Sequence, residues 1–191
     1  MTLSPQKKPV AHSKKLKKKK GLVIVYTGDG KGKTTAALGT ALRAAGHGMK
    51  VAVIQFLKGN WKTGEMTSVR QLKTPIEIQA MGEGFTWDTK DPARDRKVAE
   101  KAWGFCKRQM LSGKYDVLVF DEINYALHYD YLSLSDVLAA LKSKPKELHL
   151  ILTGRYAPPQ LIAAADLVTE MREIKHPFER EGLSGQKGIE F

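Results

Sequence analysis

The chain has 191 residues, of which 42% are hydrophobic, and it carries a formal net charge of +12 with a single cysteine. This length and composition fit one globular domain with a substantial core. No apolar run approaches the roughly 18 residues that a membrane-spanning helix requires, and one cysteine excludes an internal disulfide or a cysteine-based zinc site. Cys106 lies on the apolar stripe of a predicted helix, so we expect a core thiol.

The positive charge is concentrated at the N-terminus. Residues 1–20 hold eight lysines and no acidic residue or arginine, so residues 21–191 carry only +4. A like-charge block of this kind is typical of a disordered arm. We expect the arm to be solvated; the alternative is binding to RNA, an acidic partner or a membrane surface. The predicted organisation is therefore an arm over 1–20 and one domain over 21–191.

From residue 21 onward, short apolar runs alternate with helical stretches. The first run, 21–26, predicts a strand buried on both faces, and residues 34–45 predict a helix with Leu38, Ala41, Leu42 and Ala45 on its inner face. Further strands are expected over 51–57, 76–81, 117–120, 149–152 and 167–171, and further helices over 91–112, over 135–142 and from Pro158-Pro159. This alternation indicates an α/β fold with a mostly parallel sheet covered by helices on both faces.

Residues 27–35, TGDGKGKTT, lie between a predicted strand and a predicted helix, as a phosphate-binding loop requires. Glycines allow the backbone amides to turn toward an anion, and the helix N-terminus adds positive potential. Lys33 supplies a mobile charge for the outer phosphates, and the Thr34 hydroxyl suits a magnesium ion. Thr27 stands where the usual pattern has glycine, so the loop is a variant of a RecA-like P-loop. The expected ATP-binding residues are Gly28, Asp29, Gly30, Lys31, Gly32, Lys33, Thr34 and Thr35.

The apolar run over 117–120 is followed by Asp121 and Glu122. Acidic residues at the carboxyl end of a strand suit the metal side of a P-loop site, because ligands of open α/β sheets bind at that edge. Either carboxylate is a candidate ligand for Mg²⁺ or Mn²⁺, directly or through water. The alternative, two acids that only end a strand, is weakened by the nearby phosphate loop.

Two further segments contain candidate ligand-binding residues. Arg155 follows the strand predicted over 149–152 and is expected either to contact a phosphate or second substrate or to form a surface ion pair. Phe85 and Trp87 lie in a glycine-containing predicted loop. Exposed aromatic residues in loops often contact ligands, and the alternative is that both rings pack beneath the loop.

Six segments carry a resemblance to a known family: TGDGKGKTTAALG, VIQFLKGNWKTGE, MGEGFTW, VLVFDEINYALHYDYL, LTGR and KHPFEREGLSGQKGIEF. They follow one another over about residues 21–191 as in the ATP:corrinoid adenosyltransferases of cobalamin biosynthesis. In that family the variant phosphate loop is the norm. The chain departs from the family pattern at residues 156–159, YAPP.

The resemblance implies that the 5′-deoxyadenosyl group of ATP is transferred to a reduced corrinoid. Co(I) of the corrinoid attacks the 5′ carbon, and the whole triphosphate leaves. Lys33, the loop amides and magnesium neutralise the charge that develops on the leaving group. The resemblance places Thr34 and Glu122 on the metal, with Asp121 nearby.

The resemblance also gives Phe85 and Trp87 a role. Both match an aromatic loop that lines the lower face of the corrin, where it excludes the axial ligand that stabilises Co(II) and eases reduction to Co(I). Lys33, Phe85 and Trp87 are therefore the expected catalytic residues. By the same resemblance the protein is expected to be a cytoplasmic homodimer that receives its electron from a reduced flavoprotein of the flavodoxin type.

Two other functions agree with the phosphate loop alone. One is a RecA-like ATPase that acts on nucleic acid, with the lysine arm as its contact, although the mild charge of residues 21–191 disfavours nucleic acid. The other is a nucleotide-binding regulator without catalysis. The products formed from ATP and a reduced corrinoid distinguish these functions from the transferase.

Overall fold

A computed structural model of the protein describes residues 20–57, 59, 63–82 and 91–189. Within these ranges the chain forms a six-stranded sheet with the spatial order β3-β2-β4-β5-β1-β6. Each pair of neighbouring strands is parallel. The strands are β1 (Val23–Thr27), β2 (Val51–Gln55), β3 (Ile76–Ala80), β4 (Val117–Asp121), β5 (His149–Thr153) and β6 (Leu167–Glu170).

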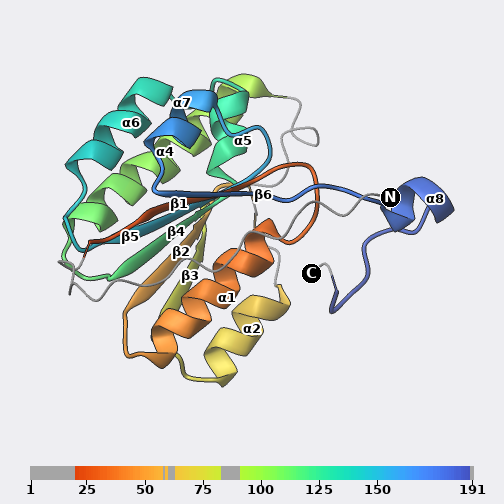
Figure 1. The fold of residues 1–191 in the computed structure, drawn as a ribbon, viewed down its shortest axis with the longest axis horizontal. Coiled ribbons are helices and arrows are strands. Elements are labelled where there is room, and N and C mark those ends of the chain that lie inside the picture. The colour runs from red at the N-terminus through yellow and green to blue at the C-terminus, as the bar shows by residue number, and fades with distance from the viewer. Residues whose placement is uncertain (1–19, 58, 60–62, 83–90, 190–191) are drawn as a thin grey trace, which may run out of the picture.

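Helices cover both faces of this sheet (Figure 1). One face carries α1 (Lys33–Gly46) and α2 (Gly64–Gln71). The other face carries α4 (Pro92–Leu111), α5 (Ile123–His128), α6 (Leu134–Ser143) and α7 (Pro159–Ala164). The short helix α8 (Pro177–Glu181) lies away from the sheet, in the segment that follows β6. The arrangement confirms the predicted α/β fold with a parallel sheet and helices on both faces.

The expected strands are all present, whereas three of the helices in the described ranges were not expected. Helix α2 has eight residues and α8 has five, which is shorter than the window of about 11–18 residues over which helical periodicity is recognised in a sequence. Helix α5 has six residues and follows directly on the acidic pair, where the sequence pattern indicates only the end of a strand. These differences leave the order of the predicted elements unchanged.

The inner face of α1 differs from the predicted one. Ala37, Ala41, Ala44 and Ala45 are buried against the sheet, and Leu42 is 50% exposed. The prediction that Leu42 faces the core was therefore wrong. Small side chains on the buried face allow α1 to approach the strands closely, and the larger leucine turns toward solvent.

Two expectations from the sequence, a core position for Cys106 and the absence of a membrane-spanning helix, can be checked in the described ranges. Cys106 is buried in the core between α4 and the sheet, and burial raises the pKa of its thiol well above the ordinary value. This confirms a core thiol rather than a reactive one. No helix within the described ranges is long and apolar enough to cross a lipid bilayer.

Four strands end in a buried polar residue at the same edge of the sheet. These residues are Thr27 of β1, Gln55 of β2, Asp121 of β4 and Thr153 of β5. Carboxyl ends of parallel strands meet at one edge, where ligands of open α/β sheets bind. The fold therefore gathers buried hydrogen-bonding groups beside the phosphate loop.

Candidate active site

The loop between β1 and α1 has the geometry of an anion-binding turn. Gly32, which precedes α1, is in the left-handed conformation with a φ of 105°. No side chain caps the helix there, so the N-terminus of α1 has the geometry that accommodates an anion. The predicted strand, loop and helix are thus present in the predicted order.

Lys33 holds its ammonium group inside the curve of this loop. Its Nζ donates hydrogen bonds to the carbonyl oxygens of Gly28 at 2.7 Å and Gly30 at 2.6 Å, and the residue is only 8% exposed. Burial lowers the pKa of Lys33 below its ordinary value, and the nearby carboxylate of Glu122 partly opposes this shift. A buried positive charge favours an anion at this position.

Two glycines of the loop also lie against the chain that follows β6. Gly30 N–H donates to the carbonyl of Met171 at 2.7 Å, and Met171 N–H donates to the carbonyl of Thr27 at 2.8 Å. A Cβ on Gly28 would lie 2.4 Å from the Met171 carbonyl oxygen, and one on Gly30 would lie 2.7 Å from the Arg172 carbonyl carbon. Packing against the chain after β6 therefore requires glycine at both positions.

Asp121 is the centre of a hydrogen-bonded group at the strand ends. Its Oδ1 accepts from the hydroxyls of Thr34 and Thr153, each at 2.8 Å, and its Oδ2 accepts from the amide of Gln55 at 3.1 Å. The aspartate is fully buried. Asp121 therefore fixes the position of the Thr34 hydroxyl, the group expected to meet the metal.

Glu122 follows Asp121 at the end of β4 and has an unusual backbone conformation. Its φ is 65°, in the left-handed region that non-glycine residues seldom adopt. Its N–H donates to the Thr153 hydroxyl at 2.9 Å. A Cβ on Gly154 would lie 3.0 Å from the Glu122 Oε2 and 2.9 Å from the Asn124 Cβ. Glycine at position 154 thus leaves room for the Glu122 carboxylate, whose charge acts on Lys33.

Arg155 lies with the phosphate loop. Its charge interacts with those of Lys33 and Asp29. Two residues later, the N–H of Ala157 donates a hydrogen bond to the hydroxyl of Thr27 at 3.2 Å, which holds this segment against the end of β1. Burial is the largest single influence on the pKa of Arg155 and would lower it, but Tyr125, Tyr156 and Asp29 together outweigh burial and the pKa is raised. The guanidinium stays charged and lies close enough to the loop to interact with Lys33 and Asp29.

Two tyrosines that interact with this arginine, Tyr125 of α5 and Tyr156 after β5, belong to a group of aromatic rings. We call Tyr125, His128, Tyr129 and Tyr156 the aromatic cluster. The His128 and Tyr156 rings lie 4.3 Å apart between centroids, and the Tyr125 ring lies edge-on to Tyr156 at 5.9 Å. The sequence analysis missed this cluster, because helix α6 and strand β5 separate its two segments along the chain.

The remaining predicted site residues divide into two groups. Three of them, Asp29, Lys31 and Thr35, are exposed on the loop and the first turn of α1. Their side chains therefore lie beside the site and face solvent. Phe85 and Trp87 lie outside the described residues. The chain reaches them through Gly82, where a Cβ would lie 2.4 Å from the Phe56 carbonyl oxygen beyond the end of β2.

Gln55, Thr153 and Gly154 belong to the site and were not predicted. Each has a signal that is visible only in retrospect. Gln55 and Thr153 are polar residues that end otherwise apolar strands, and Gly154 follows such an end. The same position in several strands, rather than any single motif, marks the ligand-binding edge.

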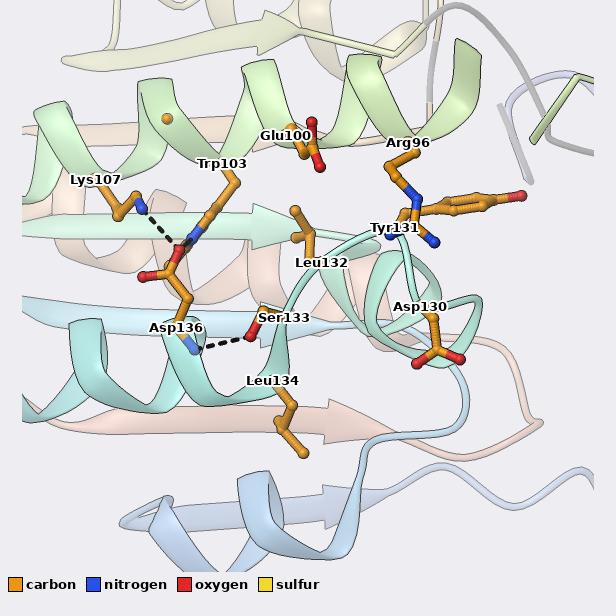
Figure 2. Close-up of a pocket in the computed structure, with 11 residues that line it drawn as sticks. Arg96, Glu100, Trp103, Lys107, Asp130, Tyr131, Leu132, Ser133, Leu134 and Asp136 are labelled. Carbon is orange, nitrogen blue, oxygen red and sulfur yellow. Dashed lines mark hydrogen bonds and ion pairs between the residues drawn. The ribbon is translucent and has the colours of Figure 1, made fainter. Parts of the chain in front are cut away.

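A separate cleft of about 440 Å³ lies between α4 and the chain that joins α5 to α6. Figure 2 shows Trp103 and Lys107 of α4 both reaching Asp136 of α6, at 2.8 Å and 2.7 Å. The residues that line this cleft belong neither to the phosphate loop nor to the acidic pair Asp121 and Glu122. The contacts join the two helices, and the cleft is not part of the site described above.

Comparisons with known proteins identify a family from the sequence and a fold class from the structure. Residues 19–191 match the family model described as ATP:corrinoid adenosyltransferase BtuR/CobO/CobP. The chain is 48% identical over 174 residues to a corrinoid adenosyltransferase of Sinorhizobium sp., covering 90% of this chain and 81% of that protein. It is 44% identical to the corrinoid adenosyltransferase of Escherichia coli K12, covering 90% and 86%. Among solved structures, the RadB recombinase superposes with a TM-score of 0.52 at 14% identity, covering 83% of this chain and 77% of that one, which confirms the RecA-like fold class.

Proposed function

The chain belongs to the ATP:corrinoid adenosyltransferase family, whose reaction is the ATP-dependent adenosylation of a corrinoid, and we propose that its phosphate loop binds the triphosphate as the leaving group of that reaction. The contact of Lys33 with Gly28 and Gly30 supports this most directly. It fixes a buried positive charge within the turn, at the N-terminus of α1. Negative charge that develops on a departing triphosphate is stabilised best by groups already in place.

The reaction needs no nucleophile from the protein. The corrinoid Co(I) attacks the 5′ carbon of ATP, the carbon–oxygen bond breaks, and its electron pair leaves with the triphosphate. The chain binds and aligns the two substrates, and the carboxyl edge of the sheet excludes water around the buried Asp121 and Lys33. Arg155 adds a further positive charge beside the loop.

The oxygen groups at this edge fit a magnesium ion. Mg²⁺ is usually held by one or two carboxylates together with substrate phosphates, and its ligands are hard oxygens. The Thr34 hydroxyl, held by Asp121, and the carboxylate of Glu122 provide such oxygens at the mouth of the loop. We propose Thr34 and Glu122 as the ligands and Asp121 as the group that positions Thr34; when bound, the metal neutralises part of the triphosphate charge.

Phe85 and Trp87 keep the role that the family resemblance implies, against the lower face of the corrin. The homodimer, the reduced flavoprotein donor, the Mn²⁺ alternative and the cytoplasmic location stay predictions on the same basis. The arm over residues 1–20 has no assigned role in the chemistry.

The product mixture tests this function. Incubation with ATP, Mg²⁺ and chemically reduced cobalamin should yield an adenosylated corrinoid and intact inorganic triphosphate, detected by mass spectrometry and phosphate chromatography. A protein without residues 1–19 should make the same products at a similar rate. Orthophosphate or pyrophosphate as the first product, or release that requires nucleic acid, would favour the ATPase alternative.

A further inference from the structure

Gln55 interrupts an apolar strand at the point where the strand reaches the site. It is the last residue of β2, is 3% exposed, and pairs in register with Asp121 of β4. Val51 and Val53, which precede it at alternate positions, belong to the core beneath α1. Because strand side chains alternate, Gln55 faces the α1 side of the sheet, where Thr34 begins that helix.

The orientation of the Gln55 amide is fixed by chemistry. A carboxylate accepts hydrogen bonds and donates none, so the group that meets Asp121 Oδ2 at 3.1 Å is the Nε2 amine. The amide oxygen Oε1 must therefore point away from Asp121. The same aspartate binds the Thr34 hydroxyl, so Gln55 is linked to the proposed metal ligand through one intervening residue.

The amide oxygen of Gln55 is buried and has no hydrogen-bond partner among the described residues. A buried acceptor without a donor is destabilising, and such groups in native proteins usually indicate an ordered water, an ion or a functional role. Leucine or methionine at this position would satisfy the apolar pattern of β2 without that cost. The amide oxygen of Gln55 thus indicates that a ligand brings a hydrogen-bond donor to this position.

We propose that Gln55 is a positioning residue for the divalent cation, whose Oε1 accepts a hydrogen bond from a water of the cation's hydration shell while its Nε2 orients Asp121. Mg²⁺ keeps several of its waters when it binds to proteins, and each such water is a donor. Partners of this outer kind commonly change metal affinity although they do not touch the metal. The inference rests on the magnesium site of the proposed function.

Metal binding to the ATP complex without corrinoid tests this role, because no transfer occurs and turnover does not enter the measurement. Mn²⁺ affinity is measured by electron paramagnetic resonance for the wild type and for Gln55→Met, Gln55→Glu and Thr34→Ala. Gln55→Met keeps the length of the side chain and removes both polar groups. Gln79→Leu is the matched control, since Gln79 is a strand glutamine of β3 exposed to solvent.

Gln55→Met should bind Mn²⁺ about 10- to 100-fold more weakly, with unchanged ATP affinity in the presence of EDTA. Gln55→Glu removes the Nε2 donor and sets a second carboxylate against Asp121 Oδ2, which disturbs the support of Thr34, so this variant should also bind Mn²⁺ more weakly than the wild type. Unchanged Mn²⁺ affinity in either Gln55 variant, with Thr34→Ala weakened, would overturn the role of Gln55 and leave the proposed function standing. Unchanged affinity in Thr34→Ala as well would remove the proposed metal site itself. If Gln55→Met does not fold by circular dichroism, the Gln55→Glu measurement decides.

Discussion

Replacement of Gly30 by alanine separates the packing role of the phosphate loop from its ligand-binding role. An alanine Cβ at this position would lie 2.7 Å from the Arg172 carbonyl carbon and 2.8 Å from the Met171 carbonyl oxygen. Both are backbone atoms, so a change of side-chain rotamer cannot relieve the clash. Gly32→Ala is the matched control, because nothing lies within 4 Å of its Cβ and only its φ of 105° opposes the substitution.

The two substitutions should differ in cost. Carbon atoms pack best at about 3.5–4.0 Å, so the chain after β6 would have to move by roughly 1 Å in Gly30→Ala. Overpacking of this kind costs about 1–3 kcal/mol, and loss of the Gly30–Met171 hydrogen bond adds about 1 kcal/mol. The total of about 2–4 kcal/mol lowers Tm by roughly 6–12 °C, at about 3 °C per kcal/mol. Gly32→Ala should cost only about 1–2 kcal/mol, the usual penalty of the left-handed region.

Thermal unfolding and amide exchange, both without nucleotide, provide the assay. Gly30→Ala should melt at the lower temperature and should expose the Met171 amide, which is bonded to the carbonyl of Thr27 in the wild type, to faster exchange. Gly32→Ala should leave that amide protected. Equal Tm values for Gly30→Ala and the wild type, with Met171 equally protected, would refute the packing argument and leave the glycine with a ligand-binding role alone.

Three further predictions concern the chemistry and the pH dependence. Lys33→Met, which keeps the apolar stem but removes the charge, should abolish turnover, and normal product formation in a discontinuous assay would contradict the assigned role. Replacement of Phe85 or Trp87 by alanine should slow the reaction that starts from Co(II) more than the one that starts from Co(I); equal losses would reject the aromatic loop as an aid to reduction. The Nδ1 of His149 accepts from Leu22 N–H at 3.2 Å, and burial lowers the pKa of His149. The folded state therefore binds this proton less readily than the unfolded state, so the stability that the neutral ring contributes is complete above about pH 6.5 and is lost as pH falls below it. His149→Gln should flatten this part of the curve in urea unfolding between pH 7 and pH 5, and an identical slope in both proteins would contradict it.

The order of the elements could be read from the chain because local patterns determine it. The apolar runs that become β1, β2 and β4 are buried on both faces, and such runs are typical of parallel strands. The phosphate loop can also be recognised from a short stretch of sequence, since phosphate binding requires closely spaced glycines, a lysine and a helix start. The family was visible for the same reason, as its motifs are short and contiguous.

The buried polar groups at the strand ends could not be predicted as a group. Gln55, Asp121 and Thr153 are separated by dozens of residues and meet only because β2, β4 and β5 are neighbours in the sheet. The sequence analysis recognised the aspartate, because an acid after an apolar strand is conspicuous. It could not assign the glutamine or the threonine, since a polar residue at the end of a strand is also an ordinary surface residue.

What the sequence determined by itself is the chemistry offered by each segment: a turn for phosphate, acids for a metal, and a strand-helix alternation for the sheet. Only the tertiary structure decided which polar atoms form hydrogen bonds with one another, such as those of Asp121 and Thr34. It also decided that the chain after β6 packs so closely against Gly30 that a side chain has no room there. The physical reason is distance along the chain. Periodicity and propensity act over a few residues, whereas these contacts depend on the order in which distant strands pair and on the close approach that the pairing imposes.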